Sequence, residues 1–245
     1  MPDPLPCLIL TGASGIVGRS FLEAAKDRFR IYAIARRPQQ KAAVPKHPNI
    51  NWIQVDIGHR EALATVMSHI KERGGADYIL HLAAHYDFDN IELADYQHTN
   101  INGTRYMLEE ARSLGISHVI FASSVAACAF PNPGEVITET TPPDADYPYA
   151  RSKKIGEAMM SEYAGDFTCS TVRLAAVFSD WCEYAPLFVF LSTWLAGQWN
   201  SRILGGKGLS AIPYIHTRDL NRLFFTLMQR TGELDSPATY IASPD

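Results

Sequence analysis

The 245-residue sequence has no long apolar run, no paired cysteine motif and no excess of basic residues. No segment approaches the roughly 20 consecutive apolar residues that a membrane-spanning helix needs, so we expect no membrane span. The cysteines form no CxxC pair and indicate reduced thiols of a cytoplasmic protein; they are Cys7, Cys128, Cys169 and Cys182. Because 26 acidic residues outnumber 22 basic ones, we expect no nucleic-acid partner.

Signals for export and for metal binding are also missing. No basic residue precedes the first apolar stretch, so we expect no signal peptide. The eight histidines include no HExxH motif, and we expect no metal site. The 47% of hydrophobic residues are typical of a globular chain that buries a large core. The sequence stops directly after a strand-like segment, which favours one domain of a longer protein.

Short apolar runs alternate with amphipathic stretches through most of the chain. We expect strands at 7–11, 31–35, 51–55, 78–82, 119–122 and 170–174, and helices at 16–26, 60–72, 101–113 and 149–163. Continuous apolar strands are typical of a parallel sheet with helices on both faces. The sequence therefore predicts an α/β fold with a doubly wound parallel (Rossmann) sheet.

The composition changes after residue 130. Residues 131–148 are rich in proline and acidic side chains and predict a loop, and residues 205–208 predict a glycine turn in preference to a phosphate loop. Residues 181–199 are aromatic, and they either pack in the core or line a pocket for an apolar substrate. A strand at 212–215, a helix at 218–229 and a strand at 239–242 follow.

A glycine-rich segment joins the first strand to the first helix. It contains Thr11, Gly12, Ser14, Gly15, Ile16, Val17 and Gly18, in a GxxGxxG spacing. Backbone N–H groups and the positive end of the helix converge there, where a pyrophosphate can bind. The segment predicts a dinucleotide site, and the alternative is a simple glycine-rich turn.

The end of the second strand bears on the choice of dinucleotide. A site that prefers NAD places a carboxylate there, whereas this chain has Arg36 and Arg37. Guanidinium groups can hold the 2′-phosphate of NADP through charge-assisted contacts. We therefore expect NADP, with NAD as the alternative, and either arginine can be the phosphate ligand.

A second group of residues suits acid–base chemistry. Ser123 and Ser124 end a strand, and Tyr149 and Lys153 are four residues apart on one face of a helix. A nearby ammonium group favours the phenolate, so we expect a lowered Tyr149 pKa and proton exchange with a substrate hydroxyl near neutral pH. A serine hydroxyl from the neighbouring strand would orient the substrate oxygen.

With these motifs the chain resembles the extended or atypical short-chain dehydrogenase/reductase superfamily, which includes epimerases/dehydratases, 3β-hydroxysteroid dehydrogenases and dihydroflavonol reductases. The motifs are TGASGIVG at 11–18, Asp56-Ile57, HLAA at 81–84, NINGT at 100–104, FASS at 121–124 and YARSK at 149–153. The resemblance implies an NAD(P)-binding domain at 1–178 and a substrate-binding lobe at 179–245, interleaved with the last sheet elements. The sequence leaves the completeness of this lobe open.

The resemblance also implies roles for particular residues. Ser124, with Ser123 as the alternative, joins Tyr149 and Lys153 as the catalytic group. The implied cofactor contacts are Asp56 and Ile57 beside the adenine, Leu82, Ala83 and Ala84 along the dinucleotide, and Asn100, Tyr149 and Lys153. Asn100 alternatively serves the central helix or a proton-relay water.

Some positions depart from the family pattern, and Ile212 is the most informative. It replaces the arginine that nucleotide-sugar enzymes use near the diphosphate, which counts against a nucleotide sugar. We therefore expect an NADP-dependent oxidoreductase that reduces a carbonyl or oxidises a secondary alcohol on an apolar small molecule. A sugar-nucleotide epimerase/dehydratase and a nucleotide-binding regulatory module are the alternatives, and a homodimer is left open.

Overall fold

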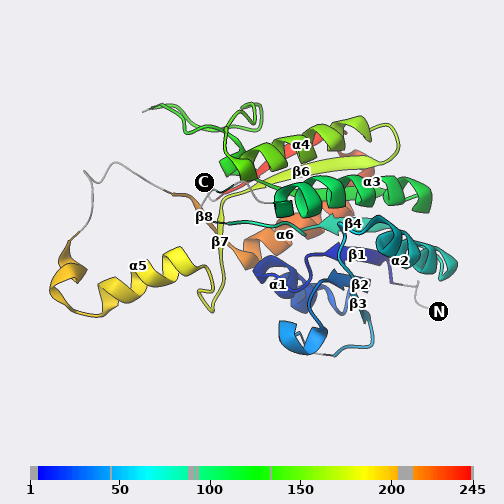
Figure 1. The fold of residues 1–245 in the computed structure, drawn as a ribbon, viewed down its shortest axis with the longest axis horizontal. Coiled ribbons are helices and arrows are strands. Elements are labelled where there is room, and N and C mark those ends of the chain that lie inside the picture. The colour runs from blue at the N-terminus through cyan, green and yellow to red at the C-terminus, as the bar shows by residue number, and fades with distance from the viewer. Residues whose placement is uncertain are drawn as a thin grey trace.

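The alternating segments of the sequence form alternating strands and helices in the computed structural model, which describes residues 5–44, 46–87, 91, 94–132, 134–203 and 212–243 (Figure 1). The first part contains β1 (Cys7–Thr11), α1 (Ile16–Ala25), β2 (Arg30–Ala35), β3 (Ile50–Gln54), α2 (Arg60–Glu72), β4 (Tyr78–His81), a π-helix (Tyr96–Asn102), α3 (Gly103–Leu114) and β5 (His118–Ser124). The second part contains α4 (Pro148–Glu162), β6 (Thr168–Leu174), β7 (Ala176–Phe178), α5 (Ala185–Leu195), β8 (Tyr214–His216), α6 (Thr217–Gln229) and β9 (Ala238–Ala242). Short 3₁₀ turns lie at Gln39–Ala42, Val125–Ala127, Trp199–Arg202 and Thr231–Glu233.

Seven of the strands form one sheet in the order β3-β2-β1-β4-β5-β6-β9. Every neighbouring pair in this sheet is parallel. The chain winds outward from β1 to β3 on one side and from β4 to β9 on the other, so the winding reverses between β1 and β4. This confirms the doubly wound parallel sheet, and ligands bind such sheets at the carboxyl ends of the strands at this reversal.

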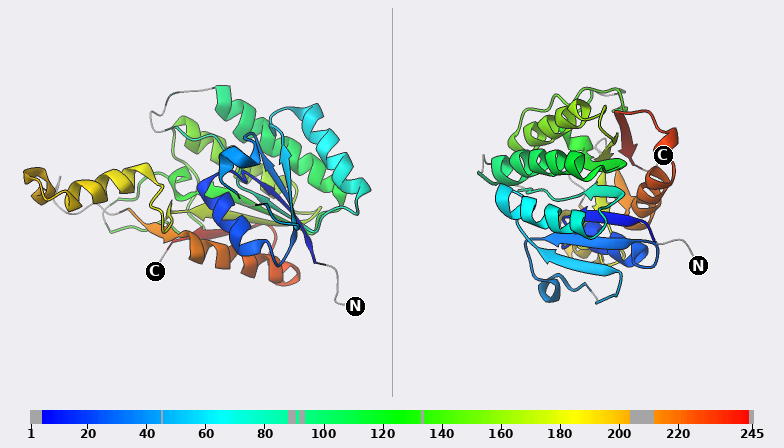
Figure 2. Two further views of the ribbon diagram at one scale, coloured as in Figure 1. Left: turned by 90° about the horizontal axis from the view of Figure 1, so that it is seen from below. Right: turned by 90° about the vertical axis from the view of Figure 1, so that its right-hand side faces the viewer.

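Helices cover both faces of the sheet, with α1 and α6 on one face and α2, α3 and α4 on the other (Figures 1 and 2). Each layer buries its own apolar cluster against the strands. Under α1 and α6, Phe21 packs edge-to-face against Phe224, with ring centroids 5.8 Å apart. Under α2 and α3, Leu63 and Leu108 are almost completely buried. The sheet is therefore inaccessible except at its edges and strand ends.

Two glycines let the first helix lie close to the strand ends. Gly12 has a φ of +69°, and a Cβ there would lie 2.7 Å from the backbone nitrogen of Ala83. A Cβ on Gly18 would overlap the carbonyl oxygen of Gly12. Any larger residue at either position would push α1 away from β1 and β4.

Residues after 178 contribute to the main sheet as well as to a projection from it. α6 packs beside α1, β9 pairs with β6, and β7 and β8 form a small parallel pair. The aromatic helix α5 projects from the body, and none of its residues is buried (Figures 1 and 2). Because Trp181 and Trp199 are 85% and 79% exposed, the expectation that 181–199 packs in the core is wrong for this structure. The division at residue 178 stays a prediction.

Other expectations can be compared with the described residues. Within them, no helix combines the length and the apolar composition that crossing a membrane requires. All four cysteines are free thiols, and three of them, Cys7, Cys128 and Cys169, are buried. The predicted glycine turn at 205–208 lies outside the described residues.

Candidate active site

A cleft of about 420 Å³ opens at the carboxyl ends of β1, β2, β3 and β4. Its lining includes ten of the predicted cofactor residues, Gly12, Ser14, Gly15, Arg36, Arg37, Asp56, Ile57, Leu82, Ala83 and Ala84. Ile34, Ala35, Val55 and Thr99, which were not predicted, complete it. The cleft has the size of a small-molecule or cofactor site, and segments distant in sequence form its walls.

The first turn of α1 faces this region with its backbone N–H groups. Gly15 is the N-cap residue, and no side chain forms a capping hydrogen bond there. The predicted residues Ile16, Val17 and Gly18 form this turn without lining the cleft. A helix end of this kind favours an anion because its N–H groups and its dipole both point outward.

Thr11 joins two loops instead of lining the cleft. Its hydroxyl accepts a hydrogen bond from the Ala83 backbone N–H at 3.1 Å and lies 2.7 Å from Nδ1 of His81. The other ring nitrogen of His81 lies 3.0 Å from the Thr104 hydroxyl on α3. Burial, together with the charge of Lys153, lowers the His81 pKa to about 3, so this histidine is neutral. The Thr11–His81–Thr104 chain fixes the end of β4, and sequence reasoning assigned it no role.

The two predicted arginines lie at the rim of the cleft in different ways. Arg37 donates to the Ser14 carbonyl at 2.6 Å and to the Ser14 hydroxyl at 3.3 Å, so it is anchored to the glycine loop. Arg36 is 53% exposed and forms a long ion pair of 3.9 Å with Asp95. Both arginines therefore line the same wall of the cleft.

Ser124, at the end of β5, faces Tyr149 on α4. The Ser124 side chain acts to lower the pKa of the Tyr149 phenol, and its hydroxyl accepts a hydrogen bond from the Ala126 N–H at 3.1 Å. Ser123 points to the other side of the strand, where it donates to Oε1 of Glu157 at 2.5 Å. Because successive strand residues point to opposite faces, only Ser124 of the two predicted serines meets the tyrosine.

Lys153 lies one turn further along α4 and is 4% exposed. Its ammonium group donates to the Ala122 carbonyl at 2.7 Å and lies 5.7 Å from the centre of the Tyr149 ring. Burial lowers the pKa of Lys153 to about 8, and the nearby charge of Glu157 opposes this shift.

The expected lowering of the Tyr149 pKa is wrong for this structure. Burial raises the Tyr149 pKa above its ordinary value, and the hydrogen bond with Ser124 only partly opposes this. The Lys153 ammonium is bonded to a carbonyl group and is not among the groups that shift the phenol. The cost of removing the phenolate from water therefore dominates over the expected attraction.

Asn100 lies in the π-helix and does not line the cleft. Its side-chain oxygen accepts from the His85 N–H at 2.7 Å, and its amide nitrogen donates to the His85 carbonyl and to the Ser152 hydroxyl. These bonds join the segment after β4 to α4. They fit the central-helix role among the alternatives for Asn100, and its cofactor contact stays a prediction.

Comparison with known proteins identifies the family. Residues 8–242 match the NAD dependent epimerase/dehydratase family. The chain belongs to this family. Membership confirms the predicted superfamily and an NAD(P)-dependent class of enzyme, and it does not distinguish a dehydrogenase from an epimerase or a dehydratase.

Relatives of this chain include dehydrogenases and an epimerase. It is 29% identical over 206 residues to a uronate dehydrogenase of Pseudomonas syringae, an alignment that covers 82% of this chain and 69% of the relative. A uronate dehydrogenase of Pseudomonas putida is 28% identical, with 70% and 60% covered. An undecaprenol-linked N-acetylglucosaminyl 4-epimerase of Escherichia coli O157:H7 is 30% identical over 158 residues, with 64% and 43% covered.

Solved structures of the family share the fold. The enzyme WbmG of Bordetella bronchiseptica, in complex with NAD, superposes with a TM-score of 0.80 at 19% identity, covering 99% of this chain and 74% of WbmG. A UDP-galactose 4-epimerase superposes with a TM-score of 0.73 at 20% identity, covering 96% and 75%. At this level of identity the likeness concerns the fold alone.

The aromatic surroundings of Tyr149 in this family member were not foreseen. Tyr86 packs edge-on against Tyr149 with ring centroids 4.8 Å apart, and Tyr96 lies 6.5 Å away. Tyr86 lies two residues after the HLAA motif, and this was the one feature of the sequence that could have placed it near Tyr149. Two aromatic rings therefore flank the Tyr149 side chain.

Proposed function

We propose that this protein is an NADP(H)-preferring oxidoreductase that interconverts a carbonyl group and a secondary alcohol on a small molecule. The observation that carries the proposal is that Ser124 faces Tyr149, with Lys153 buried on the same helix. They lie at the end of β5, beside β4, and the residues that follow β4 line the cleft. A protein that only binds nucleotide has no need of a hydroxyl pair and a buried lysine at this position.

The residues of the cleft fit a nicotinamide dinucleotide. The close approach of Gly12 to Ala83 leaves a cradle without side chains, and the adjacent end of α1 has no side-chain cap. When bound, the dinucleotide supplies or accepts the hydride. Arg36 and Arg37 support a preference for the 2′-phosphate form, because both lie at the rim where a carboxylate would favour NAD.

The chain itself supplies the proton and the orientation. Tyr149 stays protonated at neutral pH because burial raises its pKa, which suits donation of a proton to a carbonyl oxygen. Ser124 is placed to hold the same oxygen. Lys153 supplies a positive charge behind the ring, and the resemblance assigns it the ribose hydroxyls.

For the substrate we propose an apolar small molecule, since Tyr86 and Tyr96 form an aromatic border beside Tyr149. Ile212 supports this choice, because it replaces an arginine that would hold a diphosphate. A sugar substrate is the second candidate, favoured by the names of the relatives, which include uronate and L-arabinose dehydrogenases.

The test is a panel of ketones, aldehydes, uronates and nucleotide sugars, assayed with NADP(H) and NAD(H). We expect net oxidation or reduction of the cofactor, and Tyr149→Phe should lower turnover by about 10²–10⁴-fold with nearly unchanged cofactor affinity. Tyr163→Phe is the matched control, because Tyr163 ends the same helix and stacks on Phe167.

Two results would contradict the proposal. Near-normal turnover in Tyr149→Phe would show that Tyr149 is not the proton donor. Conversion of a sugar nucleotide without net oxidation or reduction of the cofactor would favour an epimerase. The cofactor preference has its own test, since Arg36→Asp or Arg37→Asp should weaken NADPH binding more than NADH binding. Tighter binding of NADH by the unaltered protein would refute the preference.

A further inference from the structure

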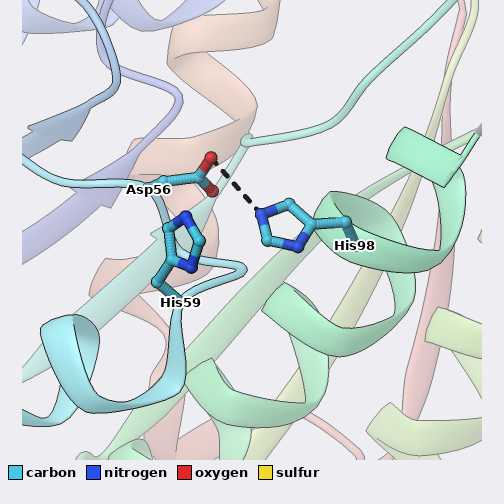
Figure 3. A group of neighbouring side chains, drawn as sticks. All are labelled: Asp56, His59 and His98. Atoms are coloured by element: carbon cyan, nitrogen blue, oxygen red, sulfur yellow. Dashed lines mark ion pairs between the residues drawn. The ribbon is translucent and has the colours of Figure 1, made fainter.

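Within the residues that the structure describes, three side chains with metal-ligating atoms meet beside the cleft. They are Asp56 and His59, in the turn between β3 and α2, and His98 in the π-helix (Figure 3). Their ligand atoms all lie within 4.8 Å of one another, and Nε2 of His98 is 3.4 Å from Oδ2 of Asp56. The two imidazole rings are 5.0 Å apart at an angle of 71°.

The backbone holds this group in position. Oδ1 of Asp56 accepts from the Gly58 N–H at 2.9 Å, which turns Oδ2 toward His98. The His59 N–H donates to the Asp56 carbonyl at 3.1 Å, so both residues belong to one tight turn at the start of α2. The His98 ring lies against Gly58, where any Cβ would overlap the imidazole. Glycine at this position is therefore what allows His98 to approach the carboxylate.

We propose that Asp56, His59 and His98 bind a divalent transition metal ion of the Zn²⁺ type. Two imidazole nitrogens and one carboxylate oxygen are a ligand set that Zn²⁺ accepts, with further positions left to water. With bonds of about 2.0–2.2 Å, tetrahedral geometry places ligand atoms about 3.3–3.5 Å apart. The separation of His98 and Asp56 already has this value, and His59 is exposed, so its ring can turn toward them.

The proposed metal site shares Asp56 with the cleft. Asp56 also lines the cleft, and the resemblance places its carboxylate beside the adenine. An ion bound to Asp56 engages the carboxylate that lines that end of the cleft, so the metal ion and the dinucleotide compete for Asp56. This competition rests on the proposed function of the cleft, whereas metal binding does not.

The first experiment is calorimetric titration of the whole chain with Zn²⁺ alone, and with Co²⁺ followed by visible absorption. We expect one ion per chain, and His59→Ala and His98→Ala should each weaken binding at least about tenfold, the lower end of the loss seen when even an outer partner of a ligand is removed. His69→Ala is the matched control, because His69 is exposed on α2 outside the group and should leave binding unchanged. The site would be overturned by absence of binding, by a histidine variant that binds as tightly as the unaltered protein, or by an equal loss in the His69→Ala control.

The second experiment follows NADPH binding by fluorescence with and without Zn²⁺. The apparent Kd of NADPH should rise with Zn²⁺ in the unaltered protein and stay constant in His98→Ala. An unchanged Kd in the unaltered protein would overturn the overlap of the two sites. Zn²⁺ binding by a chain that binds neither dinucleotide would refute the proposed function and leave the metal site standing.

Discussion

The buried ion pair between Glu157 and Arg173 offers the sharpest test of how the site is supported. The two side chains are 10% and 3% exposed, and Arg173 donates to both carboxylate oxygens, at 3.1 and 2.8 Å. Ser123 donates to the same carboxylate, and Arg173 also donates to the Thr141 carbonyl at 2.6 Å. Removing one charge leaves the other buried without compensation, which typically costs about 3–5 kcal/mol.

Glu157→Gln keeps the shape and one acceptor oxygen, so we expect a loss of about 3 kcal/mol, the lower end of that range. This is a large part of a typical unfolding free energy of about 5–15 kcal/mol. Urea denaturation at neutral pH measures it as a shift of the midpoint at constant slope. The control is Glu233→Gln, because its pair with Arg230 is more than half exposed and should cost below about 0.5 kcal/mol. A Glu157→Gln loss equal to that of the control would refute the reasoning.

The remaining predictions concern pH, backbone and packing. The pKa of His81 is lowered to about 3 and that of His118 to about 4, so below pH 6.5 these histidines are protonated in the unfolded chain but not in the folded chain. The unfolding free energy should therefore fall as the pH drops from 6.5 to 4. His118→Asn should make this fall with pH shallower in urea denaturation measurements. Gly12→Ala should cost about 1–3 kcal/mol from its positive φ and abolish dinucleotide binding measured by fluorescence, because of its contact with Ala83. Leu220→Ala, in the core, should cost about 2–5 kcal/mol, whereas Leu195→Gln on α5, 85% exposed, should stay within about 0.5 kcal/mol in the same assay.

The sheet was predictable because its strands are continuous apolar runs with helices between them. The ends of elements were less so, since tertiary contacts decide them. β5 continues to Ser124, beyond the predicted end, because Ser123 and Ser124 pair with Arg173 and Leu174 of β6. Polar side chains at these positions hide the strand from any hydrophobic pattern. The helix predicted at 101–113 begins earlier, as a π-helix whose Asn100 is held by contacts across the fold.

The site was predictable where one short motif supplies several residues. The glycine loop and the segments after β3 and β4 line the cleft as expected. The Thr11–His81–Thr104 chain and the group of Asp56, His59 and His98 were not found, because each joins segments with no shared spacing in the sequence. For residues 181–199, which the sequence assigns either to the core or to a pocket wall, the core alternative is wrong for another reason. Apolar composition indicates a surface that favours burial, but it does not state what buries it.

The pKa values of the site bear on the direction of the proposed reaction. An oxidising enzyme needs Tyr149 as a phenolate that accepts a proton from an alcohol, whereas a reducing enzyme needs the phenol. Burial favours the phenol, and Lys153, bonded to the Ala122 carbonyl, does not reverse this. The same burial brings the pKa of Lys153 to about 8, so its charge persists at neutral pH and declines above it. The groups of the chain therefore favour proton donation at neutral pH, which is the step that the proposed reduction of a carbonyl group requires.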